Sequence, residues 1–333
     1  MADLNPHDHL DFKGLRTWVL SDGKAGHVAQ SMGVAQALDV TPEIIALSQQ
    51  SGRRLLGWLG AEFHVKSLPT APYPDILIAT GRLTAPVVRY IKERSPETFT
   101  IQLMNPGGPL FYYDVLAVPS HDRLKPRDSL CTTIGAPNHI TPNLLTELQA
   151  QAPIELTATT APRLAVLVGG NSKRYQLTPA KARQLAADIL ALADQLQATL
   201  LVTTSRRTPE AVAKILADAL AGTKHFFWQP GAPGENPYNS MLALADAFVV
   251  TVDSVSMVSE ACSTGRPVYV YDLVAAEKMS KLKHFYQALQ ESGNIVTDAA
   301  QLLTAHPQPL ADAARVAGFA RAKLLQHRQR LAD

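Results

Sequence analysis

Short apolar runs alternate with longer helical stretches along most of this 333-residue chain, and this rhythm constrains the fold more than any other feature. The apolar runs have the length of β-strands. We expect strands at residues 15–20, 43–47, 75–79, 99–103, 114–118, 130–133, 164–168, 199–203, 225–228, 247–252 and 268–271. Strands that alternate with helices form parallel sheets covered by helices on both faces, so the predicted fold class is α/β.

The stretches between these runs predict the helices. We expect them at residues 26–38, 84–94, 179–196, 254–264, 279–291 and 310–331, with another beginning at Thr208-Pro209-Glu210. Pro179 suits the first turn of its helix, because its missing N–H has no partner there, and Thr178 is the expected N-cap.

The rhythm breaks near residues 147–163, where Thr, Ala and Pro are frequent and no apolar face repeats. We interpret residues 151–163 as a linker between two α/β domains. The N-terminal domain would span residues 1–150 and the C-terminal domain residues 164–305. Residues 306–333 would hold a long final helix.

Composition excludes several functional classes. Lys and Arg total 31 against 29 Asp and Glu, without a dense basic run, and aromatic residues make up 6%, so nucleic acid is not an expected partner. The two cysteines, Cys131 and Cys262, are far apart and predict neither a disulfide framework nor a zinc site. The first residues lack the pattern of a secretory signal, and no apolar run is long enough to span a bilayer. We expect a cytoplasmic protein.

In sheets of this kind, ligands bind beyond the carboxyl ends of the strands. The first strand is followed by Ser21-Asp22-Gly23-Lys24-Ala25-Gly26-His27, where Gly23 and Gly26 permit close backbone approach and the helix start offers N–H groups to an anion. His27 is either a general base or a helix-start cap. Ser120-His121-Asp122 follows the fifth strand and either contacts substrate or forms a turn.

Three further loops occupy equivalent positions in the second half. They contain Gly169, Gly170 and Asn171, then Ser205 and Arg206, and then Asn236 and Tyr238. Glycines, amides, hydroxyls and cations suit phosphate contact, and Asn236 and Tyr238 would form a wall around a base or ribose. Solvated connecting loops explain the same residues.

The most specific stretch is Asp253–Ala261, where an apolar strand leads into a hydroxyl-rich helix start. Ser254 and Ser256 would cradle a diphosphate with the N–H groups of that turn, and Met257 is a further candidate substrate-binding residue. Glu260 lies six residues past Ser254, or roughly 9 Å along a helix, and a carboxylate at that distance suits a ribose diol. A surface salt bridge is the alternative for Glu260.

Several patterns are absent. No P-loop occurs, and no G-x-G-x-x-G follows a strand, which argues against a dehydrogenase. No Asp-x-Asp pair signals a metal that would bridge a diphosphate, so we predict neither a metal nor a cofactor. Helix dipoles, hydroxyls and Arg or Lys would then neutralise the phosphate charge.

Six motifs together resemble one family: SDGKAGH, VPSHD, GGNSKRY, TTSRRTP, NPY and the segment DSVSMVSEA with TGRPV. They occur in the order found in the plant elongated-mitochondria fission-factor family and its bacterial homologues, and they spread from about Leu15 to Gly293. Bacterial members are viewed as GT-B-type glycosyltransferases. The resemblance implies two Rossmann-like domains facing a central cleft, with acceptor on the first and nucleotide sugar on the second, and a final helix that crosses back to the first.

The first loop is also similar to one in the bacterial lipid-linked N-acetylglucosaminyltransferase, where the loop faces acceptor and diphosphate. Here Lys24 and Ala25 replace a more glycine-rich turn, which weakens the transfer of a catalytic role to His27. The Glu-x7-Glu pattern of many retaining GT-B enzymes is absent, since Val252 takes the earlier position, and this favours inversion.

We therefore hypothesise a metal-independent transferase that moves a sugar from a nucleotide diphosphate to an unidentified acceptor. Asp22, His27, His121 and Asp122 are the candidate bases. A nucleotide-sugar epimerase and a non-catalytic fission adaptor are the alternatives. The basic stretch Lys278–Lys283 is compatible with contact to the inner face of a membrane carrying a lipid- or lipopolysaccharide-linked acceptor, and equally with a solvated helix.

Overall fold

The computed structural model describes residues 12, 14–47, 71–275 and 280–332. The chain divides into two compact units. The first unit comprises Met1–Thr133, Pro137–His139 and Ala311–Asp333, and the second comprises Ile134–Ala136 and Ile140–Leu310. Within the described residues, no helix is long and apolar enough to cross a membrane.

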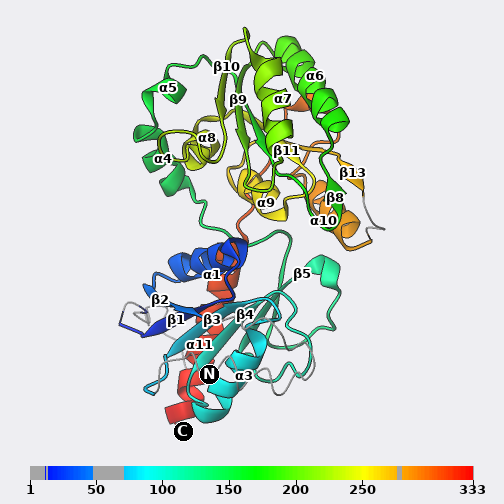
Figure 1. Ribbon diagram of the computed structural model, residues 1–333. Coiled ribbons are helices and arrows are strands. Elements are labelled where there is room, and N and C mark those ends of the chain that lie inside the picture. The colour runs from blue at the N-terminus through cyan, green and yellow to red at the C-terminus, as the bar shows by residue number, and fades with distance from the viewer. Residues whose placement is uncertain (1–11, 13, 48–70, 276–279, 333) are drawn as a thin grey trace. The chain divides into compact units, whose positions relative to one another are not determined.

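The first unit is built on a parallel sheet in the order β2-β1-β3-β4-β5-β6 (Figure 1). Its strands are β1 Thr17–Ser21, β2 Pro42–Ala46, β3 Ile76–Thr80, β4 Phe99–Leu103, β5 Val115–Pro119 and β6 Leu130–Thr133. Its helices are α1 Ala25–Ala37, α3 Ala85–Arg94 and α11 Asp312–Ala332, with a 3-10 turn η1 at Ser120–Asp122.

Alternate side chains of these strands build two separate cores. Ile76 and Ile78 on β3 pack in one cluster with Val34 of α1 and Val316 of α11. Leu77 and Ala79 face the other way, into a cluster that includes residues of α3. Because side chains on a strand point alternately to opposite faces, a strand covered by helices on both faces is apolar throughout. This explains the continuous burial of β3.

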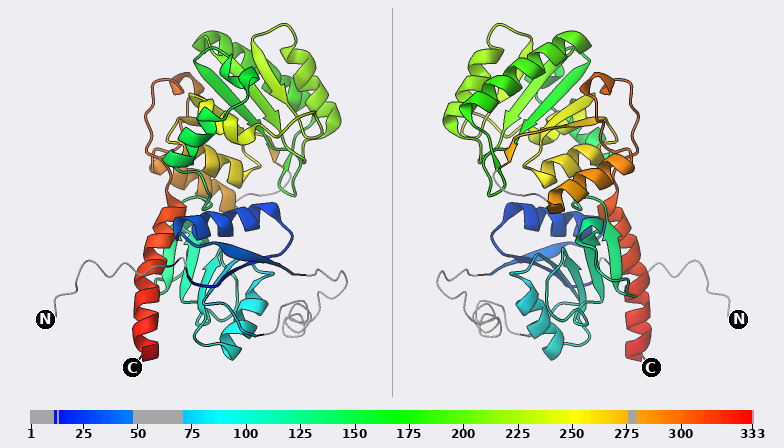
Figure 2. Two further views of the ribbon diagram at one scale, coloured as in Figure 1. Left: turned by 90° about the vertical axis from the view of Figure 1, so that its left-hand side faces the viewer. Right: turned by 90° about the vertical axis from the view of Figure 1, so that its right-hand side faces the viewer.

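The final helix belongs to the first unit, as the resemblance implied (Figure 2). Val316, Ala320 and Leu324 are buried against that unit's sheet. Polar contacts add to this packing, since Lys323 Nζ lies 2.6 Å from Asp128 Oδ2 and a ring nitrogen of His327 donates to the backbone oxygen of Glu97 at 2.9 Å. The chain thus returns to its first unit after completing the second.

The second unit holds a parallel sheet in the order β10-β9-β7-β11-β12. Its strands are β7 Arg163–Val168, β9 Thr199–Thr204, β10 His225–Trp228, β11 Ala247–Thr251 and β12 Val268–Tyr271. A two-stranded antiparallel ribbon joins β8 Tyr175–Gln176 to β13 Val274–Ala275. The main helices are α6 Pro179–Leu196, α7 Glu210–Leu220, α8 Tyr238–Leu244, α9 Val255–Ser263 and α10 Ser280–Glu291.

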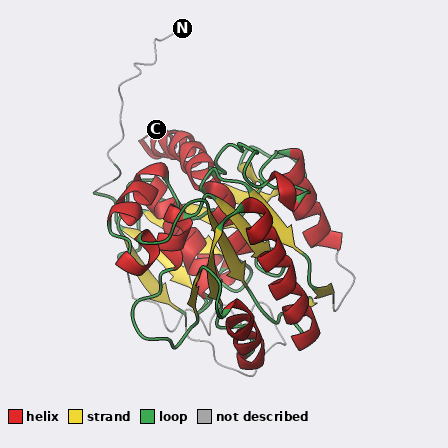
Figure 3. Ribbon diagram, turned by 90° about the horizontal axis from the view of Figure 1, so that it is seen from above, coloured by secondary structure: helices red, strands yellow, loops and turns green. Residues whose placement is uncertain are grey.

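The strand order of this sheet reverses between β7 and β11. From β7 the chain adds β9 and β10 on one side, and then returns to add β11 and β12 on the other. Crossovers of the usual right hand place the connecting helices on both faces of such a sheet. Figure 3 colours the helices red and the strands yellow. Every pairing within the two larger sheets is parallel, so the α/β fold with two Rossmann-like units is confirmed.

The chain expected to be a linker has structure of its own. Residues 151–163 contain helix α5, Ile154–Thr157, and its Leu156 is fully buried in the core of the second unit. Helix α4, Pro142–Ala150, precedes it, and the Leu144 N–H donates to its N-cap Thr141 at 3.2 Å. The second unit therefore takes up the chain at Ile140, earlier than the predicted boundary. Helices of four and nine residues are too short to give a periodic apolar face.

The predicted N-cap of α6 is confirmed. The Thr178 hydroxyl accepts the Lys181 N–H at 3.2 Å at the start of α6. At α7 the cap residue is Pro209, because Thr208 is engaged elsewhere and donates to the backbone oxygen of Gly169.

Candidate functional site

The reversal between β7 and β11 brings two loops of the second unit together at the carboxyl edge. Gly169 and Gly170 follow β7, and Asp253 follows β11. The Gly169 N–H donates to the Thr251 hydroxyl at 2.7 Å, and the Gly170 N–H donates to Asp253 Oδ2 at 2.9 Å. The crevice at such a reversal is the usual ligand site of open α/β sheets.

Asp253 is the centre of this cluster. Its side chain is fully buried, accepts the Thr251 hydroxyl at 2.7 Å, and lies 2.8 Å from Arg207 Nη2. Three donors thus hold a carboxylate that burial alone would disfavour. Both residues lie in motifs of the sequence, but no role was predicted for either of them. A carboxylate directly after a buried strand, opposite a Gly-Gly pair, was the available signal.

Close packing explains both glycines. A side chain at Gly169 would collide with the Asp253 carboxylate, and one at Gly170 would collide with the backbone of Arg207. Ser205 also supports this loop, because its hydroxyl donates to the Gly169 oxygen at 2.7 Å. Arg206 is exposed, and the Asn171 side-chain oxygen accepts the Leu177 N–H at 2.9 Å. The predicted loops therefore lie together, and the side chains of Ser205 and Asn171 hold their backbone by hydrogen bonds.

A small cavity of about 330 Å³ opens beside this cluster. Its lining consists of Ser172, Lys173, Arg174, Tyr175, Asp253, Val255 and Leu282. Lys173 and Arg174 form no ion pair within the described part of the chain, whereas the charge of Asp253 is met by Arg207. The cavity thus offers two uncompensated cations beside the first turn of α9.

Helix α9 points its amino end toward this edge. Ser254 is its N-cap residue and is buried, and no side chain caps the helix. The first N–H groups of a helix have no intrahelical partner and carry positive potential. Ser256 and Met257 are half-buried in that first turn. These are the elements predicted to cradle a diphosphate, and the structure brings them next to the two-cation cavity through Val255.

Glu260 and Tyr238 form a direct pair, with the Tyr238 hydroxyl donating to Glu260 Oε2. Burial raises the pKa of Glu260 to about 7, although the hydrogen bond from Tyr238 opposes the rise. Burial and the neighbouring carboxylate raise the pKa of Tyr238 well above its usual value. A surface salt bridge, the alternative reading of Glu260, is not what the structure shows.

Tyr238 is placed by helix α8, which replaces the loop expected there. The Asn236 side-chain oxygen accepts the Tyr238 N–H at 3.1 Å at the start of that helix. Arg266 holds the other end, where its guanidinium donates to the backbone oxygens of Leu242, Ala243 and Ala245. Arg266 of the TGRP segment therefore stabilises the helix that carries Tyr238.

A second cluster lies at the carboxyl edge of the first unit. The Asp22 side chain is 1% exposed, and its Oδ2 lies 3.0 Å from Nδ1 of His27 and 2.7 Å from Lys24 Nζ. Because a carboxylate only accepts, Nδ1 of His27 carries the proton of the neutral ring and Nε2 is left as the acceptor. Gly23, with φ of +79°, permits the turn, and Gly26 lies in the first turn of α1.

Charge and burial keep this pair in the state that a general base requires. Burial raises the pKa of Asp22, but the hydrogen bond from Lys24 and the charge of His27 outweigh it, so its pKa lies below the usual value. Burial lowers the pKa of His27 against the opposing charge of Asp22. The His27 ring packs against Gly81 at the end of β3. A Cβ at Gly81 would lie 2.7 Å from the ring's Cε1, so a larger residue at that position would displace the ring.

The other predicted bases lie elsewhere on this sheet. His121 and Asp122 form the turn η1 after β5, while Asp22 follows β1. β3 and β4 separate those strands, a gap of three strand spacings or about 14 Å. The four candidate bases are therefore not one constellation, and Asp22 with His27 is the pair that the structure assembles.

Within the described residues, no three His, Cys, Asp or Glu side chains gather as a metal site. The basic stretch Lys278–Lys283 lies partly outside those residues. Of its cations, the side chain of Lys283 is described and is exposed.

Comparisons with known proteins agree with the fold. A structure of UDP-GlcNAc 2-epimerase from Methanocaldococcus jannaschii matches with a TM-score of 0.52 at 12% identity, over 92% of this chain and 99% of that one, which supports the fold alone. "Uncharacterized protein RP120" of Rickettsia prowazekii (strain Madrid E) is 27% identical over 351 residues, covering 91% of this chain and 97% of that protein.

One relative is a plant protein. "Mitochondrial fission protein ELM1" of Arabidopsis thaliana is 32% identical over 248 residues, which cover 66% of this chain and 56% of the plant protein. The chain thus spans little more than half the length of that relative. The model of the family described as "Mitochondrial fission ELM1" matches residues 25–324, from the first turn of α1 into α11. The chain belongs to the mitochondrial fission ELM1 family.

Proposed function

We propose that the second unit binds a nucleotide sugar and that the protein transfers the sugar to an acceptor hydroxyl. The observation that carries this proposal is the cluster at the reversal between β7 and β11. There the buried Asp253, paired with the exposed Arg207, accepts the Gly170 N–H, and Thr251 accepts the Gly169 N–H, beside a cavity with two uncompensated cations. Such a cavity, next to the uncapped start of α9, suits a diphosphate.

Glu260 completes the donor site in this proposal. Its carboxylate accepts hydrogen bonds from the ribose hydroxyls in place of the Tyr238 hydroxyl, which then faces the base with Asn236. Lys173, Arg174 and the N–H groups at Ser254–Met257 stabilise the diphosphate as it leaves. Gly169, Gly170, Ser205 and Arg206 form the wall of the same loop cluster. No metal takes part in these steps.

The first unit supplies the base in this proposal. Neutral His27 takes the proton of the acceptor hydroxyl at Nε2, while Asp22 holds the ring by its Nδ1 proton and stabilises the imidazolium that forms. The acceptor oxygen bonds to the anomeric carbon as the bond to the diphosphate breaks. An acceptor linked to lipid or lipopolysaccharide, and contact with a membrane, remain predictions of the sequence.

A panel of nucleotides and nucleotide sugars tests donor binding by thermal shift. A ligand of the folded state at a hundredfold excess over its dissociation constant adds about 2.7 kcal/mol of stability. We expect a nucleoside diphosphate to raise the melting temperature and the bare nucleoside to leave it nearly unchanged. A panel in which no nucleoside diphosphate shifts the melting temperature contradicts the proposal.

An epimerase is the second candidate function, because the M. jannaschii epimerase shares the fold over most of both chains. An epimerase needs no acceptor. Incubation of the protein with UDP-GlcNAc alone separates the two functions, since formation of an epimer would replace the transferase proposal. A fission adaptor without catalysis would neither bind nucleotides nor form any product.

A further inference from the structure

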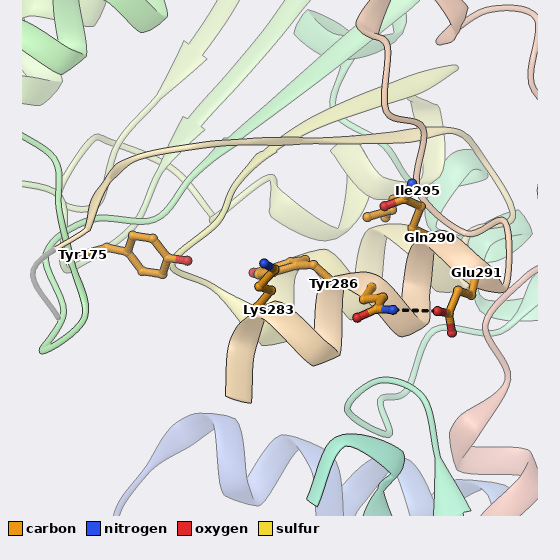
Figure 4. A pocket seen from close by; sticks show the side chains of 7 residues that line it. Tyr175, Lys283, Tyr286, Gln290, Glu291 and Ile295 are labelled. Carbon is orange, nitrogen blue, oxygen red and sulfur yellow. Dashed lines mark hydrogen bonds between the residues drawn. The ribbon is translucent and has the colours of Figure 1, made fainter. Parts of the chain in front are cut away.

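A second cavity of the second unit has no part in the proposed donor site. This α10 cavity has a volume of about 1040 Å³, roughly three times the 330 Å³ of the small cavity beside α9 (Figure 4). Most of its lining comes from helix α10. The lining residues are Tyr175, Lys283, Tyr286, Gln287, Gln290, Glu291 and Ile295.

Tyr175 lines both cavities. It is 2% exposed and lies on β8, where pairing with Ala275 of β13 fixes its backbone. Figure 4 shows its hydroxyl directed toward Lys283 and Tyr286. In the described part of the chain this hydroxyl makes no hydrogen bond. Burial, with the charges of Asp272 and Asp253, raises the pKa of Tyr175 to about 12, so the hydroxyl stays protonated and remains a donor.

The described lining of the α10 cavity combines apolar surface with polar groups and has no net charge. Lys283 and Glu291 offset each other, and Gln287 Nε2 donates to Glu291 Oε1 at 2.8 Å, the bond drawn in Figure 4. The Gln290 amide has no partner within the described residues. The hydroxyl of Tyr286 donates to the backbone oxygen of Val252, which fixes its ring in the wall. The described lining thus has no surplus positive charge to hold an anion.

Sugars have the complementary chemistry. Their hydroxyls both donate and accept hydrogen bonds, as side-chain amides do, and their C–H faces pack on aromatic rings. Two Gln side chains, one carboxylate, one free phenol and one fixed tyrosine ring therefore suit a saccharide. The volume, well above that of the neighbouring small cavity, suits a chain of more than one ring.

We propose that the α10 cavity is an additional acceptor subsite, carried by the second unit beside the acceptor face that the resemblance assigns to the first, and that it takes an uncharged glycan of more than one ring. The inference rests on the proposed function, because the small cavity is assigned to the donor diphosphate. Tyr175 lies between the two cavities, so its free hydroxyl positions the acceptor beside the donor.

A glycan array with the full-length protein tests this subsite, followed by calorimetry with the tightest neutral oligosaccharide found. We expect Tyr175→Phe and Gln290→Ala each to weaken glycan binding roughly three- to tenfold, as loss of one neutral hydrogen bond does. Tyr269→Phe on β12 and Gln149→Ala on α4 are the matched controls, because neither residue lines the cavity. The controls should bind as the wild type does.

UDP titrations of the same samples separate the inference from the proposed function. Gln290→Ala should leave UDP affinity unchanged. UDP binding without binding of any glycan overturns the acceptor subsite and leaves the donor site standing. Glycan binding that Tyr175→Phe and Gln290→Ala both retain also overturns it. Glycan binding without UDP binding supports the subsite and contradicts the proposed function.

Discussion

The pKa of Glu260 is raised far enough by the structure to be measured. Burial raises its pKa from the usual 4.5 to about 7, so the folded state holds a proton that the unfolded state has released. This contribution to stability is full below pH 4.5 and is lost as the pH rises through 7. At pH 8 the buried charge costs at most about 3 kcal/mol.

Replacement of this charge gives the first prediction. Glu260→Gln keeps an oxygen that accepts the Tyr238 hydroxyl and removes the charge. We expect the variant to be more stable than the wild type at pH 8 and equal to it below pH 4.5, as measured by urea unfolding at both pH values. Nucleotide binding by the wild type should tighten between pH 6 and 8, because the ionised carboxylate is the better acceptor. A pH-independent difference in stability contradicts the assigned pKa.

His27 gives the second prediction. Its pKa lies below the usual 6.5, so turnover should rise with pH through a value below 6.5 and then level off. His27→Ala should lower kcat for acceptor-dependent UDP release by about 10²–10⁴ and leave UDP affinity intact. Asp22→Asn should move the acid limb to lower pH, because it removes the charge that raises the pKa of His27. The exposed His306→Ala is the control, and equal losses in both His variants would contradict the assignment.

Gly169 gives the third prediction. Gly169→Ala forces the loop away from Asp253 and should destabilise the protein and weaken nucleotide binding. Gly318→Ala on α11 meets no atom within 4 Å and should be neutral or stabilise by about 0.5–1 kcal/mol through helix propensity. Thermal unfolding of both variants, with and without UDP, checks the pair. Equal stability of the two variants would contradict the close packing at Gly169.

At the scale of elements, the strand positions follow well from the sequence. Residues 99–103, 130–133, 225–228 and 268–271 are strands with the expected bounds, and β4 is buried throughout while β6, β10 and β12 are partly buried edge strands. Helices α4 and α8 escape prediction, since neither exceeds nine residues and neither repeats an apolar face. Asp253 and Arg207 escape because their ion pair joins loops 46 residues apart, and local sequence does not reveal it.

Helix α8 carries the fourth prediction. Arg266→Ala leaves the backbone oxygens at its C-terminal end without their donor and should lower the free energy of unfolding by about 1–3 kcal/mol. Because α8 carries Tyr238, the same change should weaken nucleotide binding. Arg163→Ala is the control, because Arg163 is another cation of this unit that donates to backbone oxygens. It should destabilise the protein without weakening nucleotide binding. Urea unfolding and UDP titration of both variants measure the two effects.

At the scale of the whole molecule, the six motifs lead to the family and the fold, and the structure explains what several of them do. The reversal of strand order brings together three of them, GGNSKRY, TTSRRTP and DSVSMVSEA. Arg266 of the TGRP motif donates to backbone oxygens at the C-terminal end of α8, the helix that carries Tyr238. SDGKAGH and VPSHD lie at separate strands of the first unit. The sequence predicts which residues follow strands, but partners such as Tyr238 for Glu260 depend on the order of the strands in space.

Titration of the full-length protein with UDP in a calorimeter tests the central claim most directly. We compare the wild type with Glu260→Ala and with Glu147→Ala, an exposed carboxylate on α4. We predict saturable binding by the wild type and by Glu147→Ala, and an affinity at least about tenfold weaker in Glu260→Ala, since hydrogen bonds to a charged group contribute about 1.5–3 kcal/mol. Absence of UDP binding by the wild type, or equal affinity in all three proteins, would contradict the account.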